Sequence, residues 1–311
     1  MKYVLIIVAL VLSAGCRSES PKESEDAVVN QARLEATGQA APYAGATGTV
    51  AGTIRISGDP PPLLPDLAEI PVGKCFKAHE RHRHLFRKAP DGALADVLVA
   101  VTEYDGEIPA PKQPVQVTIE DCAFSQRTIA MMMGQKIEVL NKGPAAATPQ
   151  LIGSPVPALR VAVPGGEPVS LIPHAPGKYR LVDRSHEFAF AEVFVLNYPT
   201  VTVTDVTGRF EISGIPIGDV RVSALLPLTE VTSDQKVTVR AGQTTDVQFE
   251  LTFSLEDWKS SLAEEARTRR EQAAARSDDA KDQSKQTGGH TQNPSGPAGS
   301  EAVPNTSAVQ Q

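Results

Sequence analysis

The chain is a succession of short apolar or alternating runs that are separated by turns rich in Pro and Gly. Residues 47–57 alternate polar and apolar side chains with a period of two, as a half-buried strand does. Residues 96–102 are nearly all apolar, which is typical of a buried strand. With 25 Pro, 23 Gly and only 5% aromatic residues, the sequence favours many short strands over helices. It therefore predicts an all-β protein, built as a sandwich or barrel. Further predicted strands are 115–120, 128–133, 136–141, 159–163, 168–172, 177–182, 190–196, 235–239 and 245–253.

Two segments in the middle of the chain carry an ordered set of motifs. The first reads Cys122-Ala-Phe-Ser and is followed by Lys136-Ile-Glu-Val-Leu-Asn141. The second reads Gly177-Lys-Tyr-Arg-Leu and is followed by Asp183-Arg-Ser-His186-Glu-Phe-Ala189, with Pro199 thirteen residues after His186. In order and spacing these segments resemble the blue-copper proteins of the cupredoxin-like family. The resemblance spans about 47–253 and implies a degenerate cupredoxin-like Greek-key sandwich over 61–197.

The same resemblance implies that the family's metal site is largely lost. In the relatives, a His follows the Asn of the first strand by six residues, and a Cys-x-x-His-x-x-Met sequence supplies the other ligands. Those places hold Ala147, Asp183, His186 and Ala189. Type-1 copper needs a thiolate, two imidazoles and usually a weak thioether, so we expect no copper and no cofactor. Asp183 and His186 could still bind zinc weakly or act as acid and base, or they form only local hydrogen bonds in a remnant loop.

After Pro199 the pattern of turns changes. An acidic residue and a Gly mark a hairpin, an aromatic residue follows in the next strand, and Pro-x-Gly precedes a further strand. These residues are Asp205, Gly208, Phe210, Pro216 and Gly218. The pattern resembles the carboxypeptidase regulatory-like (transthyretin-like) module, which implies a small β-sandwich over 198–253, with Gly208 and Gly218 at turns of positive φ. The strand in 45–60 matches the first strand of such a module, so we expect the cupredoxin-like part to be inserted after it.

The N-terminus has the pattern of an export signal. Residues 1–15 combine Lys2, an apolar run and a small-residue exit, which predicts a signal peptide. Ala14-Gly15-Cys16 resembles the end of a bacterial lipobox, in which Cys16 is acylated after cleavage; ordinary cleavage after Gly15 is the alternative. Residues 16–44 are polar and predict a flexible tether. We therefore expect a lipoprotein that is anchored in a membrane of the cell envelope and faces the periplasm or the cell surface.

The two remaining cysteines are Cys75 and Cys122. Export places them in an oxidising compartment, where a pair of cysteines predicts a disulfide. The bridge would join residues 47 positions apart and stabilise the fold by about 3–4 kcal/mol. The alternative is a pair of free thiols with a metal or redox role.

Residues 74–88 are the most basic stretch, with six Lys or Arg and three His against a single Glu. His82 and His84 would share one face if this segment were a strand, an arrangement that can bind a metal weakly. Together with His79 they could instead contact an anion, or the stretch is a solvated loop pinned by Cys75. Met131, Met132 and Met133 suggest either core packing or a soft-metal site.

Ser254-Leu-Glu-Asp257 predicts the start of a helix over 254–276, with Leu255, Trp258, Leu262 and Ala266 on one face. Trp258 would either dock this helix onto the domain or anchor a partner. Residues 277–311 contain almost nothing apolar and predict a disordered tail.

The net charge of −7 gives no reason to expect nucleic-acid binding. No nucleophile, phosphate-loop or dinucleotide motif occurs, so we predict a protein that is not an enzyme and that binds or scaffolds an envelope protein or glycan. Two alternatives remain: metal handling or electron transfer at an altered site around His186, and a carbohydrate-binding accessory module.

Overall fold

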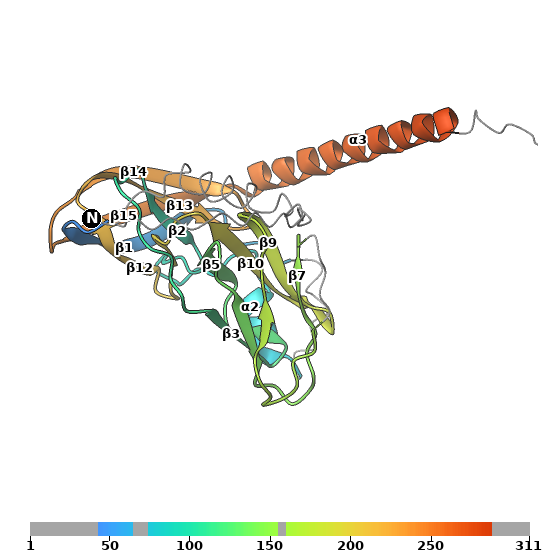
Figure 1. Cartoon of the computed structure of the whole chain (residues 1–311), viewed down its shortest axis with the longest axis horizontal. Coiled ribbons are helices and arrows are strands. Elements are labelled where there is room, and N and C mark those ends of the chain that lie inside the picture. The colour runs from blue at the N-terminus through green and yellow to red at the C-terminus, as the bar shows by residue number, and fades with distance from the viewer. Residues whose placement is uncertain (1–42, 65–73, 155–159, 288–311) are drawn as a thin grey trace, which may run out of the picture.

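The structure, a computed structural model, describes residues 43–64, 74–154 and 160–287 as two β-sandwiches and a long C-terminal helix (Figure 1). The predicted signal peptide (1–15), Cys16, nearly all of the predicted tether (16–44) and the tail from residue 288 lie outside the described residues. The all-β prediction is confirmed, because the described residues form fifteen strands in four sheets and only two helices. Within the described ranges, neither helix is long and apolar enough to cross a membrane.

The outer sandwich joins the two ends of the folded chain. Its first sheet has the strand order β12-β1-β15, and its second has the order β11-β2-β13-β14. Val50, Leu94, Val222 and Phe249 are among the side chains that fill the core between them. Gly208 and Gly218 have φ values of +72° and +134°, as their turn positions predict. The strands are β1 (Thr47–Gly58), β2 (Leu98–Thr102), β11 (Val201–Val203), β12 (Arg209–Pro216), β13 (Gly218–Leu226), β14 (Val231–Val239) and β15 (Thr244–Phe253).

The inserted sandwich lies between β2 and β11 in sequence. One sheet has the order β4-β3-β6-β8 and the other β5-β10-β9-β7. The pairs β3–β6 and β10–β5 are parallel and the others antiparallel, so the chain crosses between the sheets as in a Greek key. The strands are β3 (Val115–Glu120), β4 (Ala123–Phe124), β5 (Thr128–Met132), β6 (Ile137–Asn141), β7 (Pro149–Ile152), β8 (Val169–Leu171), β9 (Gly177–Asp183) and β10 (His186–Leu196).

The boundary between the sandwiches differs from the predicted one. The first strand does lie in the outer sandwich, where β1 pairs with β12 and β15. However, β2 also belongs there, because it pairs with β11 and β13. The predicted cupredoxin-like range 61–197 is therefore divided, and the insertion follows the second strand of the outer sandwich. An apolar run such as β2 shows that a strand is buried, but it does not identify the sheet that buries it.

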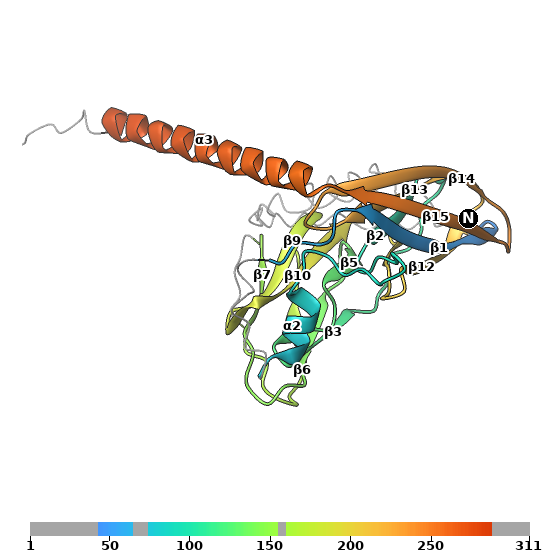
Figure 2. The ribbon, with the colours of Figure 1, turned by 180° about the vertical axis from the view of Figure 1, so that it is seen from behind.

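The first helix, α2 (Phe76–His82), lies against the inserted sandwich (Figure 2). Ala78 on α2 packs with Val182 and Phe190. A loop or a strand was expected over 74–88, but residues 76–82 are helical. Ala78 and His82, four residues apart, are both buried, as residues on one helical face are.

The C-terminal helix, α3 (Leu255–Thr287), extends away from both sandwiches (Figures 1 and 2). The amide of Asp257 donates to the side chain of Ser254, so the predicted cap is present. Leu255 and Trp258 pack against the outer core, whereas Leu262 is 44% exposed. The helix continues beyond the predicted end at 276 into the predicted tail (277–311). A helix forms its backbone hydrogen bonds within itself, so α3 can extend past residue 276 although this part contains almost no apolar residues.

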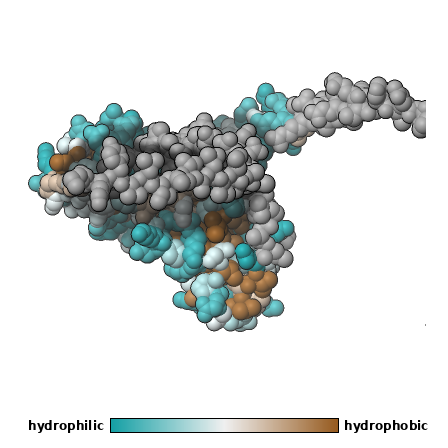
Figure 3. Space-filling model, viewed as in Figure 1, coloured by the Kyte–Doolittle hydropathy of each residue, from teal (hydrophilic) through white to brown (hydrophobic). Residues whose placement is uncertain are grey.

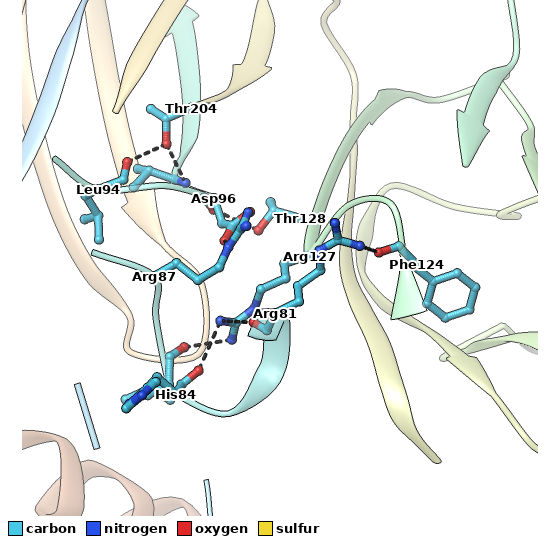
Figure 4. Close-up of polar contacts among 11 residues, drawn as sticks. Arg81, His84, Arg87, Leu94, Asp96, Phe124, Arg127, Thr128 and Thr204 are labelled. Atoms are coloured by element: carbon cyan, nitrogen blue, oxygen red, sulfur yellow. Dashed lines mark hydrogen bonds and ion pairs between the residues drawn. The ribbon is translucent and has the colours of Figure 1, made fainter. Parts of the chain in front are cut away.

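The two sandwiches are joined by a buried polar network around Arg127 (Figure 4). The guanidinium of Arg127 donates to the backbone oxygens of Arg81 at 3.1 Å, His84 at 3.0 Å and Leu85 at 2.9 Å. Burial lowers the pKa of Arg127 to about 10, so the group is still charged at neutral pH. Arg127 precedes β5, so one side chain of the inserted sandwich fixes the segment that leads into the outer one.

Two further contacts complete this joint. Arg87 forms a two-pronged ion pair with Asp96, with both nitrogen–oxygen distances at 2.7 Å. The hydroxyl of Thr128 donates to the backbone oxygen of Asp96 at 2.8 Å, and that of Thr204 donates to the oxygen of Leu94 at 2.8 Å (Figure 4). These hydrogen bonds and the ion pair are directional, so together they fix how the residues at the joint are oriented relative to one another.

Replacing Arg127 by Met should lower the free energy of unfolding by about 3–5 kcal/mol, because three buried carbonyl oxygens lose a charged donor. Arg83→Met is the matched control, since Arg83 is exposed, and should change stability by less than about 0.5 kcal/mol. Urea unfolding of both variants measures the difference. Equal effects would show that the joint does not depend on this guanidinium.

Candidate functional site

A pocket of about 460 Å³ lies at the end of the inserted sandwich where β6 and β9 finish. We call it the His186 pocket. Its walls come from the residues before α2, the β3–β4 turn, the loop after β6 and the β9–β10 turn. The lining residues are Lys74, Cys75, Ile119, Glu120, Asp121, Cys122, Asn141, Gly143, Pro144, Ala145, Ala146, Ala147, Asp183, His186 and Phe188.

The carboxylate of Asp183 is a buried polar group of this pocket with several hydrogen bonds. Its side chain is 1% exposed. One carboxylate oxygen accepts from the amides of Thr148 at 2.7 Å and Ser185 at 3.1 Å. The other lies 2.9 Å from Nδ1 of His186. Three donors therefore compensate the buried carboxylate, and the carboxylate in turn orients the imidazole.

The loop after β6 is pinned by Asn141. Its side-chain amide donates to the backbone oxygens of Ala145 and Ala162, both at 2.8 Å. Its side-chain oxygen accepts from the amide of Gly143 at 2.8 Å. Ala147 then exchanges two backbone hydrogen bonds with Ala162 at 3.0 and 2.9 Å. The strand-end Asn therefore shapes the wall on which Ala147 lies.

Three of the four positions that the resemblance assigns to copper ligands line one pocket. These are Ala147, Asp183 and His186. Ala189 is fully buried in the core cluster that also contains Ala147. Of these four side chains, only His186 carries a nitrogen ligand, and it is paired with Asp183. The four side chains therefore do not supply the thiolate, two imidazoles and thioether of a type-1 copper site.

The predicted disulfide between Cys75 and Cys122 is confirmed, and it forms one wall of the His186 pocket. The two sulfur atoms and a ring nitrogen of His186 all lie within 4.8 Å of one another. The sequence does not predict that His186 lies beside the disulfide. No sequence signal indicates it, because Cys122 and His186 are 64 residues apart and belong to different segments of the pocket wall.

The histidines of the basic stretch do not form a common site. His82 ends α2 and is fully buried, whereas His84 follows the helix, with Nδ1 at 3.3 Å from the oxygen of Pro61. His79 lies one helical turn before His82. The strand that would have placed His82 and His84 on one face is absent, because the chain after Cys75 is helical. A weak metal contact shared by His82 and His84 on one strand face therefore has no geometric support among these described residues.

His82 instead packs its ring against Phe190, with the ring centroids 4.9 Å apart. Neither ring nitrogen has a hydrogen-bond partner among the described residues. Burial, together with the charges of Arg127, Arg81 and Arg87, holds the pKa of His82 well below 6.5. The imidazole is therefore neutral at physiological pH.

This burial predicts a pH dependence of stability. Because the pKa of His82 is lower in the folded state, the unfolded chain binds an extra proton below pH 6.5. The free energy of unfolding therefore includes the full contribution of neutral His82 above that pH. Below it, this contribution falls by up to about 1.4 kcal/mol per pH unit. The variant His82→Phe should lack this component, while the control His79→Phe should retain it. Urea unfolding between about pH 7.5 and 5 measures both slopes, and identical slopes would contradict the assignment.

Two other candidates have structural roles. Met131 is 1% exposed in the core of the inserted sandwich, and Met133 packs against that core. Trp258 packs against the outer core and donates its indole N–H to the oxygen of Leu228 at 3.0 Å. Core packing and helix docking thus account for these side chains.

No protein-family model matches the chain, and no curated protein matches it. Solved structures with matching parts include a copper-containing nitrite reductase (NirK) from Thermus scotoductus SA-01, at 17% identity over 30% of this chain and 24% of that one, with a TM-score of 0.25. A purple cupredoxin from Nitrosopumilus maritimus matches at 14% identity over 26% of this chain and 98% of that one, with a TM-score of 0.24. Amicyanin from Paracoccus versutus matches at 14% identity over 31% and 96%, with a TM-score of 0.25.

The inserted sandwich has two four-stranded sheets around one core, each with one parallel strand pair. This arrangement is the cupredoxin-like Greek key that the sequence predicted.

Proposed function

We propose that this chain is a non-catalytic lipoprotein of the cell envelope, in which the inserted sandwich binds or scaffolds a partner instead of carrying electrons on type-1 copper. The observation that supports this proposal is the state of Asp183. By the sequence resemblance, Asp183 stands where the relatives have the copper thiolate, and its buried carboxylate has three hydrogen-bond donors. A pocket remains there, and binding is the function that a pocket without a reactive group can perform.

The surroundings of His186 support the non-catalytic part of the proposal. A nucleophilic hydroxyl would need to hydrogen-bond to the imidazole that activates it. The hydroxyl of Ser185 lies 3.0 Å from that of Thr148 instead. Among the described residues, the Asp183–His186 pair therefore has an orienting carboxylate, and no hydroxyl is hydrogen-bonded to its imidazole.

The surface of the inserted sandwich favours contact with a protein. Figure 3 shows hydrophobic residues gathered on the lower part of this face, where Figure 1 draws the inserted sandwich. Ile152, Val161, Val163 and Ile172 of the inserted sandwich are 43–58% exposed. Exposed apolar patches commonly mark interaction surfaces. A glycan site is less favoured, because Phe76 is the only strongly exposed aromatic residue among those described, and it lies on α2 rather than on a sheet.

We also propose that the outer sandwich is a carboxypeptidase regulatory-like module, because its turns have the sequence pattern of that module.

Copper binding tests the functional proposal. The oxidised protein incubated with Cu(II) should show no intense visible band of the type-1 kind, because no thiolate is available. The triple variant Ala147→His, Asp183→Cys and Ala189→Met should become coloured, since the resemblance assigns these positions and His186 to the copper ligands. Adding His186→Ala to the triple variant supplies the control, which should stay colourless. A blue unmodified protein would overturn the proposal.

Membrane anchoring is tested at Cys16, which follows the apolar run of the predicted signal peptide. The variant Cys16→Ser should lose the acyl chains and move from the membrane fraction to the soluble fraction of bacterial cells. Immunoblots of the two fractions, with fatty-acid labelling of the wild type, measure this change. An unlabelled wild type, or a variant that stays membrane-bound through its N-terminus, would contradict lipidation.

A further inference from the structure

We propose that reduction of the Cys75–Cys122 disulfide creates a zinc site in which the two thiolates and His186 bind a single Zn²⁺ ion. This inference is independent of the proposed binding function, which concerns the oxidised protein. It rests on three observations: the proximity of the three ligand groups, the hydrogen bond that orients His186, and the pocket that they share.

The ligand atoms are already close. Both sulfur atoms and a ring nitrogen of His186 lie within 4.8 Å of one another. Around a tetrahedral zinc ion, ligand atoms lie roughly 3.3–3.8 Å apart, for bonds of about 2.0–2.3 Å. The nitrogen must therefore approach the sulfurs by an amount that side-chain rotations supply. Two thiolates and one imidazole form a recognised zinc-ligand set, with water in the fourth position.

The hydrogen bond between His186 and Asp183 favours the tautomer that a metal ligand requires. Its Nδ1 lies 2.9 Å from Asp183, whose carboxylate accepts further hydrogen bonds and is therefore fixed. A proton on Nδ1 leaves the lone pair on Nε2. This carboxylate–histidine arrangement is the usual outer shell of zinc sites, where it sets the tautomer and strengthens the ligand. Asp183 thus has a place in the site without binding the metal itself.

The pocket provides access for both a reductant and a metal ion. Cys122 and His186 are partly exposed, and the hollow of about 460 Å³ has room for the water that completes the coordination. Cys75 lies directly before α2 and Cys122 lies in the β3–β4 turn, so the sulfurs belong to two separate segments. Once the bond between them is broken, the sulfurs can separate as a tetrahedral ion requires.

The reaction balances with a dithiol as the reductant. The dithiol is oxidised to its own disulfide, and its two electrons and two protons convert Cys75–Cys122 to two thiols. When Zn²⁺ binds, each thiol releases its proton to solvent, and the two thiolates neutralise the charge of the ion. Bound zinc would then protect the thiols from reoxidation, because thiolates held by the metal are not free to attack.

The test uses the full chain, purified in detergent and reduced anaerobically with a phosphine that is then removed. Reduced protein should bind about one equivalent of Zn²⁺ by native mass spectrometry, and Co²⁺ in its place should show thiolate-to-metal absorption. Oxidised protein should bind neither ion. His186→Gln and Asp183→Asn should each weaken zinc binding by about 10–100-fold. His174→Gln is the matched control, since His174 is exposed and does not line the pocket, and should have no effect.

Two further measurements keep the result interpretable if reduction loosens the fold. Circular dichroism of the double variant Cys75→Ser, Cys122→Ser shows whether the chain folds without the bridge, and this variant should not bind zinc. If the reduced wild type unfolds, zinc should restore its fold. The proposal is overturned if reduced protein takes up no more zinc than oxidised protein, if zinc fails to restore a reduced and unfolded chain, or if His186→Gln binds as tightly as the wild type.

Discussion

The buried guanidinium of Arg127 is the interaction on which the arrangement of the two sandwiches depends. A charged group that is 5% exposed is tolerated only when its donors are satisfied, and here three backbone oxygens satisfy them. All three oxygens belong to residues 81–85, which include the end of α2 and continue to Leu85 in the outer core. Because an unsatisfied guanidinium would be costly, the fold permits only placements of this segment that keep those contacts.

The same constraint reaches the His186 pocket. Arg127 holds the end of α2 from one side, and the Cys75–Cys122 bridge holds its start from the other. Between these two points Ala78 packs on Val182 and Phe190, next to the hairpin that carries Asp183 and His186. A helix of only seven residues would not persist alone, so its position follows from these attachments rather than from helix propensity.

Within the pocket, the carboxylate of Asp183 determines the chemistry at the end of the hairpin. A thiolate in a blue-copper site is a metal ligand, whereas the carboxylate of Asp183 accepts hydrogen bonds from two amides and an imidazole. The contacts of Asn141 fix the neighbouring loop. Because a scaffold of paired strands tolerates changes at its loop ends, pockets of different chemistry can be built on the same kind of fold.

The sequence by itself determined most of the strands, the all-β class, the disulfide, the positive φ at Gly208 and Gly218, and the start of the last helix, because these follow from local periodicity, turn chemistry and the number of cysteines. The predicted strand 159–163 is not a strand over its described residues, where only Ala162 forms an isolated bridge, and β7 was not predicted. Only the tertiary structure decided that β2 pairs in the outer sandwich, that His82 is buried apart from His84, and that His186 lies beside the disulfide. Each of these depends on contacts between segments far apart in the chain. No local pattern records such contacts, since an apolar strand or a basic helix can be buried against several different partners.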